Sequence, residues 1–445
     1  MSTVIIDGAH VVTVSGAEHP EGHVVVDDGR ITRVGPGRAP EIPGARHVDG
    51  RGCLATPGLV NTHHHLYQWA TQGMFIDVSL FEWLSGSYEI WQRLDSEAVF
   101  GTTTAGLGWL ALSGCSTASD HHYIFPSDSG DMVAAEVEAA RRVGVRLDLA
   151  RGSMDRGRSD GGLPPDGVVE SLDGALAATE AAIDTHHDPS FGAMTRVAVA
   201  PCSPFSVSRE LMVGAAELAR AKGVRLHTHL AETADEEEKC LAEFGCTPVE
   251  YAEKLGWLGG DVWFAHAVHL SDNAVSRIAG SGTAVAHCPT SNARLGAGIC
   301  RVPELIEAGV TIGIGVDGPA SSELTPLSGE MHQALLMARA RKGPQALSAR
   351  QALRLATLGG ARCLGRGDEL GSLETGKLAD VALWRIDGFG YDVIDDPVVA
   401  LTFGPPPPLE LLLVGGDTVV ERGELRTVSA DAAARAGRAA HRKLL

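Results

Sequence analysis

The sequence predicts an α/β protein: a (β/α)8 TIM barrel over residues 57–369, with a small β-sandwich domain built from both chain ends, residues 1–56 and 370–445. Three observations lead to this prediction. Both ends of the chain alternate short β-rich runs with turns. The middle alternates strand-like and helix-like segments, which favours a parallel sheet. Eight candidate strands occur in that middle, the number that closes such a barrel.

The β-rich runs at the two ends resemble parts of one structure. Near the start lie TVIIDG at 3–8, HVVTVSG at 10–16 and HVVVDDGRITRVG at 23–35. Near the end lie VALWRIDG at 381–388 and ELLLVGGDTVVERGEL at 410–425, where a Gly-Gly turn separates two apolar runs. We therefore expect the two ends to share one β domain.

Each of the eight middle runs is apolar and ends in polar side chains. Amphipathic helix-like stretches, such as 209–223 and 301–309, lie between them and end near a glycine. Barrel active sites form at the carboxyl ends of the strands, so we expect the functional side chains there. The runs are CLATPGLVNTHHH, STASDHHYI, RLDLARGSM, RVAVAPCSPF, RLHTHLAET, VWFAHAVHL, TAVAHCPTSN and TIGIGVDGPA.

The composition argues against several classes of function. The net charge is −19, from 37 Lys and Arg against 56 Asp and Glu, which disfavours binding to nucleic-acid phosphates. The longest stretch without charges or histidine, residues 98–119, is interrupted by four glycines, so we expect no membrane association. The eight cysteines lack CxxC spacing and no secretory signal is visible, which favours a cytoplasmic location.

Residue types that bind zinc recur at four of the strand ends. On a strand, His63 and His65 share one face and His64 points to the other, so His63 and His65 can share one ion inside a barrel. Zinc binds histidine nitrogen and aspartate oxygen, and it lowers the pKa of bound water to about 7. The other candidate ligands and proton carriers end three further runs: His229 with Glu232, His266, and Asp317.

These segments resemble the amidohydrolase superfamily, and within it the deaminase and chlorohydrolase branch that binds a single metal. The resemblance covers essentially the whole chain. Its motifs are DDGRITRVGP, PGLVNTHHHLYQ, HTHLAET, FAHAVHL, HCPTSN, GVDG and LGSLETGKLADVALW.

The resemblance implies a role for each matched residue. It implies one Zn2+ per subunit, with Fe2+ as the alternative, and a homo-oligomer, a dimer or larger. No lysine matches the bridging ligand of binuclear members. The implied metal ligands are His63, His65, His229 and Asp317, and the implied catalytic residues are Glu232, His266 and Asp317.

Five further segments are NTHHHLYQ, DHHYIFP, RGSMDRGRSDGGLPPD, APCSPFSVS and HLAETADEEEKC. Together they resemble 8-oxoguanine deaminases and their relatives. This narrower resemblance implies a metal-dependent aminohydrolase that acts on the C–N bond of a cyclic amidine and releases ammonia from an amino-substituted N-heterocycle: an 8-oxoguanine-like purine, a pterin or an isocytosine-like pyrimidine. Two alternatives stay open: an s-triazine hydrolase releasing chloride or an alkylamine, and an adenosine or S-adenosylhomocysteine deaminase. A metal-binding protein without catalysis would need a missing ligand or acid, and none is missing.

Four residues after strand ends are candidates for binding this small heterocyclic substrate: Gln68, Trp83, Arg151 and Cys202. Structural roles compete for three of them. Cys202 can be a buried apolar residue, Trp83 can pack a loop, and Arg151 can pair with Asp155 or Asp160.

Other polar residues near the strand ends are expected to support the site. One of His121 and His122 is expected to line it without matching a ligand position, while His269, His287 and Asn292 are expected to brace it. Pro319 and Ser322 depart from the pattern of the relatives, which leaves the shape of the pocket open.

Overall fold

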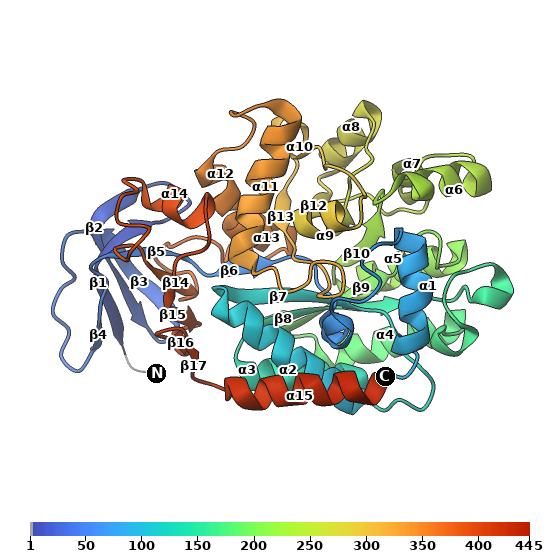
Figure 1. The fold of residues 1–445 in the computed structure, drawn as a ribbon, viewed down its shortest axis with the longest axis horizontal. Helices are drawn as coiled ribbons and strands as arrows, with labels where there is room; N and C mark the ends of the chain where they lie inside the picture. The colour runs from blue at the N-terminus through green and yellow to red at the C-terminus, as the bar shows by residue number, and fades with distance from the viewer. Residues whose placement is uncertain (1–2) are drawn as a thin grey trace.

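The computed structural model describes residues 3–445, and its larger part is a closed barrel of parallel strands (Figure 1). The barrel prediction is confirmed. The strands follow one another in chain order around the barrel, and β13 closes it by pairing with β6 through Ile314 and Asn61. They are β6 (Leu59–Asn61), β7 (Cys115–His122), β8 (Arg146–Ser153), β9 (Thr195–Pro201), β10 (Leu226–Leu230), β11 (Val262–His266), β12 (Ala284–His287) and β13 (Ile312–Ile314).

The two chain ends form one mixed sheet beside the barrel, so the prediction that they share a β domain is also confirmed. The strand order is β17-β16-β15-β14-β5-β1-β2-β3, with β4 paired to β1. Strand β5 joins the halves, because it pairs with β1 on one side and β14 on the other. The bounds are β1 (Val4–Val12), β2 (Glu18–Asp27), β3 (Arg30–Pro36), β4 (Arg46–Asp49), β5 (Cys53–Pro57), β14 (Val381–Arg385), β15 (Leu409–Val414), β16 (Asp417–Glu421) and β17 (Glu424–Leu425).

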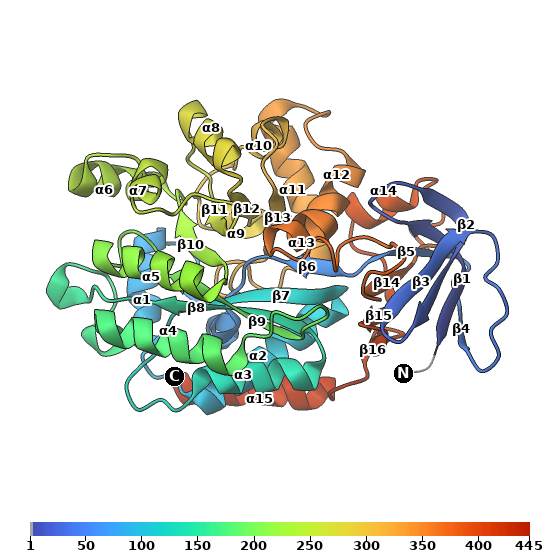
Figure 2. The same cartoon turned by 180° about the vertical axis from the view of Figure 1, so that it is seen from behind.

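Helices between the barrel strands form its outer layer (Figure 2). Local sequence fixes their ends: the Ser208 side chain accepts the backbone N–H of Leu211 at the start of α5, and Gly223 ends that helix with a φ of 69°. The α-helices of the whole described chain, including those after the last barrel strand, are α1 (Leu80–Trp91), α2 (Ser96–Leu112), α3 (Met132–Val143), α4 (Leu172–His186), α5 (Arg209–Lys222), α6 (Ala234–Phe244), α7 (Pro248–Lys254), α8 (Asp272–Ser281), α9 (Pro289–Arg294), α10 (Val302–Glu307), α11 (Leu327–Lys342), α12 (Ala349–Arg354), α13 (Gly360–Cys363), α14 (Pro397–Thr402) and α15 (Ala430–Leu444).

The last helix, α15, returns from the terminal sheet to the barrel and lies along α2 (Figure 1). A Cβ atom at Gly101 of α2 would lie 2.9 Å from the carbonyl oxygen of Ala436, so glycine permits this close approach. The Arg93 guanidinium also donates to the carbonyl of Leu444 at 2.7 Å. In the described part of the chain, no helix has both the length and the apolar character needed to cross a bilayer.

Candidate metal centre and active site

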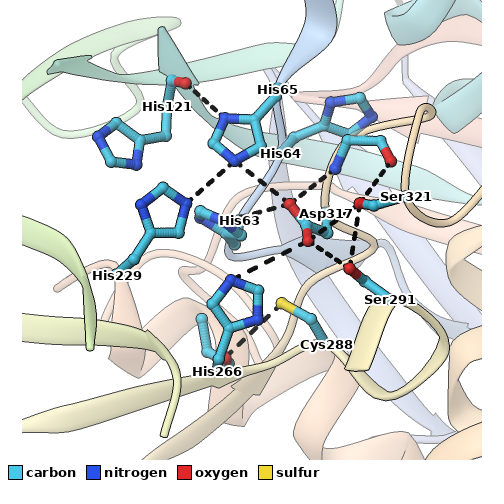
Figure 3. Close-up of polar contacts among 12 residues, drawn as sticks. His63, His64, His65, His121, His229, His266, Cys288, Ser291, Asp317 and Ser321 are labelled. Atoms are coloured by element: carbon cyan, nitrogen blue, oxygen red, sulfur yellow. Dashed lines mark hydrogen bonds and ion pairs between the residues drawn. The ribbon is translucent and has the colours of Figure 1, made fainter. Parts of the chain in front are cut away.

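Four of the predicted ligands meet at the carboxyl end of the barrel strands (Figure 3). Oδ1 of Asp317 lies 3.4 Å from Nε2 of His63 and 3.2 Å from Nε2 of His65. Nε2 of His229 lies 3.1 Å from Nε2 of His65. All four side chains are buried.

The three measured distances, 3.1–3.4 Å, are close to those between ligands of one metal ion. The ligand atoms form two groups that share His63, one with His65, His121 and His229 and one with His266 and Asp317. Ligands about 2.0–2.2 Å from a tetrahedral zinc ion lie roughly 3.3–3.6 Å from one another. The opposite nitrogen of each ring is engaged elsewhere, which leaves the three Nε2 atoms for the ion. Nδ1 of His63 contacts Nε2 of His227 at 2.8 Å, that of His65 contacts the carbonyl of His121 at 2.6 Å, and that of His229 contacts the carbonyl of Cys202 at 2.7 Å.

The protonation states suit metal binding. Burial, and then neighbouring histidines, hold the pKa values of His63 and His229 well below the usual range. Burial works against ionisation of Asp317, but His63 and His65 outweigh it and hold the pKa of this carboxyl well below its usual value. Neutral imidazoles and a carboxylate are the forms in which these side chains bind a cation.

Glu232 and His266 face the ligand cluster from β10 and β11. Nε2 of His266 lies 3.7 Å from Oε2 of Glu232 and 4.0 Å from Oδ2 of Asp317. Nδ1 of His266 contacts Oδ1 of Asn292 at 2.9 Å, which orients the ring. Burial, and then the charge of Asp317, raise the pKa of Glu232 to about 8, so this carboxyl holds a proton near neutral pH and can donate it.

The backbone beside these residues is strained. Ala231, His266, Ala267 and Asp317 adopt φ values of 54°, 71°, 48° and 62°, which are uncommon for residues with a side chain. The buried carboxylate of Glu236 accepts the backbone N–H groups of Ala231 and Glu232, both at 2.8 Å. These two bonds hold the turn that directs Glu232 toward the site.

A cavity next to the cluster contains three of the four predicted substrate-binding residues: Gln68, Trp83 and Cys202. Oε1 of Gln68 is buried without a hydrogen-bond partner among the described residues. A Cβ atom at residue 318 would lie 1.8 Å from that oxygen, which explains the glycine after Asp317. Trp83 donates from Nε1 to the carbonyl of Ala320 at 3.2 Å, so it both lines the cavity and fixes the loop after β13.

Arg151, the fourth, is not among the residues that line this cavity. Its guanidinium forms a bidentate pair with Glu170, at 2.8 and 2.7 Å, and lies over the ring of Phe125. The ion-pair partner of Arg151 is therefore neither Asp155 nor Asp160. Asp155 instead accepts hydrogen bonds from the backbone N–H and the hydroxyl of Ser208. Glu170 lies beyond the third run, so the partner could not be read from local spacing.

The structure adds residues that sequence reasoning missed. His227 orients His63, and its spacing of two residues from His229 on one strand was a usable signal. Ser291 and Ser321 both donate to Oδ2 of Asp317, at 2.6 and 3.2 Å, from helix α9 and from the loop after β13, which no spacing rule relates. His121 was expected to line the site without matching a ligand position, and its ring nitrogen lies within the same ligand group as those of His63, His65 and His229.

The structure places the other histidines named in the sequence analysis as follows. His64 faces away from the cluster, with Nδ1 3.7 Å from Oδ1 of Asp120. His122 lies with Asp120 and Glu136 rather than in the cavity. His269 contacts the carbonyl of Ala297 at 2.7 Å, and His287 is buried at the end of β12.

Comparisons with known proteins agree with this geometry. The sequence profile of the amidohydrolase family matches residues 54–414. The 8-oxoguanine deaminase of Pseudomonas aeruginosa (strain PAO1) is 43% identical over 398 residues, which cover 89% of this chain and 88% of that protein. An isoxanthopterin deaminase from an unknown prokaryotic organism is 37% identical over 85% of this chain and 83% of its own length.

A solved structure shares the whole fold. The crystal structure of atrazine chlorohydrolase TrzN from Arthrobacter aurescens TC1, in complex with zinc, superposes with a TM-score of 0.94 at 33% identity. The match covers 98% of this chain and all of that one. The chain therefore belongs to the amidohydrolase family and is a metal-dependent enzyme that acts on C–N bonds.

Proposed function

We propose that this enzyme is a zinc-dependent hydrolytic deaminase of an amino-substituted N-heterocycle, an 8-oxoguanine-like purine, a pterin or an isocytosine-like pyrimidine, and that it releases ammonia. The observation that carries the proposal is the buried carboxyl of Glu232 beside the ligand cluster, 3.7 Å from Nε2 of His266, where burial raises its pKa. A ring nitrogen of an amidine becomes a good electron sink when it is protonated, and Glu232 is placed to supply that proton.

The proposed ligands of the ion are His63, His65, His229 and Asp317, whose spacing fits zinc. Zinc, when bound, supplies a Lewis acid that makes water nucleophilic near neutral pH. Fe2+ is the alternative ion. The solved relative in complex with zinc supports the choice of metal.

The chain's own residues then divide the proton transfers. Glu232 protonates the ring nitrogen, which makes the adjacent amine-bearing carbon electrophilic toward water. Asp317 accepts the proton that the water loses and passes it to the departing amine. His266, held by Asn292, stabilises the new C–O bond on the side facing Glu232 and Asp317.

Recognition of the heterocycle is proposed to use Gln68, Cys202 and Trp83. The unpartnered Oε1 of Gln68 can accept an N–H from the ring edge. Burial raises the pKa of the Cys202 thiol to about 12, so it lines the cavity as a neutral group. The indole of Trp83 offers an apolar face.

The test is ammonia release by the zinc-loaded protein from 8-oxoguanine, isoxanthopterin, isocytosine, guanine and S-adenosylhomocysteine. We expect release from one of the first three, and a rate that is at least about 10²-fold lower after Glu232→Gln. Release only from S-adenosylhomocysteine would favour the adenosine-type alternative, and no release from any of them would contradict the deaminase proposal.

A triazine hydrolase is the second candidate, favoured by the similarity to the atrazine chlorohydrolase structure. The same ligand cluster and acid would serve it, so only the products distinguish the two. Formation of chloride or an alkylamine from a substituted s-triazine, without deamination of the heterocycles above, would select it. The homo-oligomeric state and the cytoplasmic location stay predictions.

A further inference from the structure

A second group of side chains that can ligate a metal lies outside the cavity. Asp120 and His122 alternate on β7, so both point to the helix layer, and Glu136 reaches them from α3. One nitrogen or oxygen atom from each of the three lies within 4.8 Å of the other two. All three are fully buried, and the proposed deamination uses none of them.

The atoms that face one another in this group are acceptors. Nε2 of His122 lies 2.9 Å from the carbonyl oxygen of Ile124, which can only accept, so Nε2 carries the hydrogen of the neutral ring. Its Nδ1 therefore presents a lone pair, 3.5 Å from Oε1 of Glu136. Burial lowers the pKa of His122 to about 4, so the ring is neutral at pH 7.

No cationic side chain compensates the two carboxylates. Oδ1 of Asp120 accepts the backbone N–H of Leu66 at 2.6 Å. No N–H or hydroxyl donor of the described chain reaches Oδ2 of Asp120, either oxygen of Glu136 or Nδ1 of His122. The two carboxyls lie against each other, and burial, then Glu136, raise the pKa of Asp120 well above its usual value. Within residues 3–445, no Lys or Arg nitrogen lies within 4.0 Å of either carboxylate, and only imidazoles approach them. Buried acceptors left this way need a proton or a cation between them.

The distances favour a cation. A proton shared by Glu136 and His122 would draw their oxygen and nitrogen to about 2.6–2.9 Å, which is shorter than the observed 3.5 Å. A proton held between the carboxyls of Asp120 and Glu136 would leave the buried Nδ1 of His122 without a partner, whereas a cation contacts all three groups. Two ligands of one zinc-sized ion lie roughly 3.3–3.6 Å apart, as in the catalytic cluster. We propose that Asp120, His122 and Glu136 bind a second divalent transition-metal ion, separate from the catalytic one.

The chemistry of this site is that of a structural ion. Two carboxylates and one imidazole are oxygen and nitrogen donors of the kind that zinc accepts, and their two negative charges balance a divalent cation. The ion links β7 to α3. Asp120 also holds Leu66 and lies 3.7 Å from His64, so the ion supports the segment that carries His63 and His65.

The experiment uses the full chain loaded with Zn2+ and freed of excess metal. We expect two zinc ions per chain by plasma mass spectrometry, and two anomalous peaks at the zinc edge in crystals, one of them between β7 and α3. Glu136→Gln should retain one ion and unfold at a lower temperature. Glu138→Gln, at a half-buried position on the same helix that faces Arg141 and Arg142, should retain both.

A variant that removes a ligand of the catalytic ion distinguishes the catalytic site from the proposed second site. His63→Asn should lose the catalytic ion and keep the anomalous peak between β7 and α3. Should Glu136→Gln fail to fold, the anomalous map of the wild-type protein still decides the question. A single zinc ion per chain, or a second peak at any other place, would overturn the proposal, whatever the activity of the enzyme.

Discussion

At the scale of single residues, the three consecutive histidines should behave unequally. His63→Asn and His65→Asn remove an Nε2 that faces Asp317, so each should lose the catalytic ion and, with it, ammonia release. His64→Asn should keep that ion and activity within about tenfold, because its ring faces Asp120. Zinc content and turnover of the purified variants check this, and equal loss in all three would refute it.

The proton of Glu232 provides a second prediction at this scale. Glu232→Gln keeps the shape of the side chain and removes its acid function, so kcat should fall by about 10²–10⁴-fold. The zinc content and unfolding temperature should stay near those of the wild type, because Glu232 is no proposed ligand. Glu238→Gln, on the exposed surface of α6, is the matched control and should leave kcat unchanged. Undiminished turnover of Glu232→Gln would exclude the proposed acid.

At the scale of elements, β8 and the segment before α4 are joined by Arg151 and Glu170. Arg151→Met leaves a largely buried carboxylate without its partner and should lower the free energy of unfolding by about 1–3 kcal/mol. The KM for the substrate should not change, since Arg151 lies outside the cavity. Gln68→Ala should do the opposite, raising KM at nearly constant stability. A raised KM in Arg151→Met at wild-type stability would restore its substrate role.

At the scale of the whole molecule, the sequence predicts the features that local patterning controls, which are the barrel and the residues at its strand ends. Alternation on a strand placed His63 and His65 together, and the rule that barrel sites lie at the strand ends added His229, His266 and Asp317. The pairing of Arg151 with Glu170, and the hydrogen bonds from Ser291 and Ser321 to Asp317, depend on how segments distant in sequence meet. Periodicity does not encode such contacts. The return of α15 onto α2 was missed for the same reason, since its partner helix lies more than 300 residues earlier.

The contact between barrel and terminal sheet includes one buried ion pair. Arg146 at the start of β8 donates to both carboxylate oxygens of Asp380, at 3.2 and 3.1 Å, next to β14. The two side chains are only 2% and 3% exposed, so neither charge can be hydrated when the other is removed. Arg146→Met alone should therefore lower the free energy of unfolding by about 3–5 kcal/mol.

Adding Asp380→Asn should recover much of that loss, because it removes the unpaired charge while its carbonyl still accepts the N–H of Gly415. Denaturant unfolding of both single variants and the double variant measures the coupling between the two residues. Arg51→Met, which breaks an exposed pair with Asp49 in the terminal sheet, should change nothing measurable. Additive losses in the double variant would show that this ion pair contributes nothing specific to the contact between the two domains.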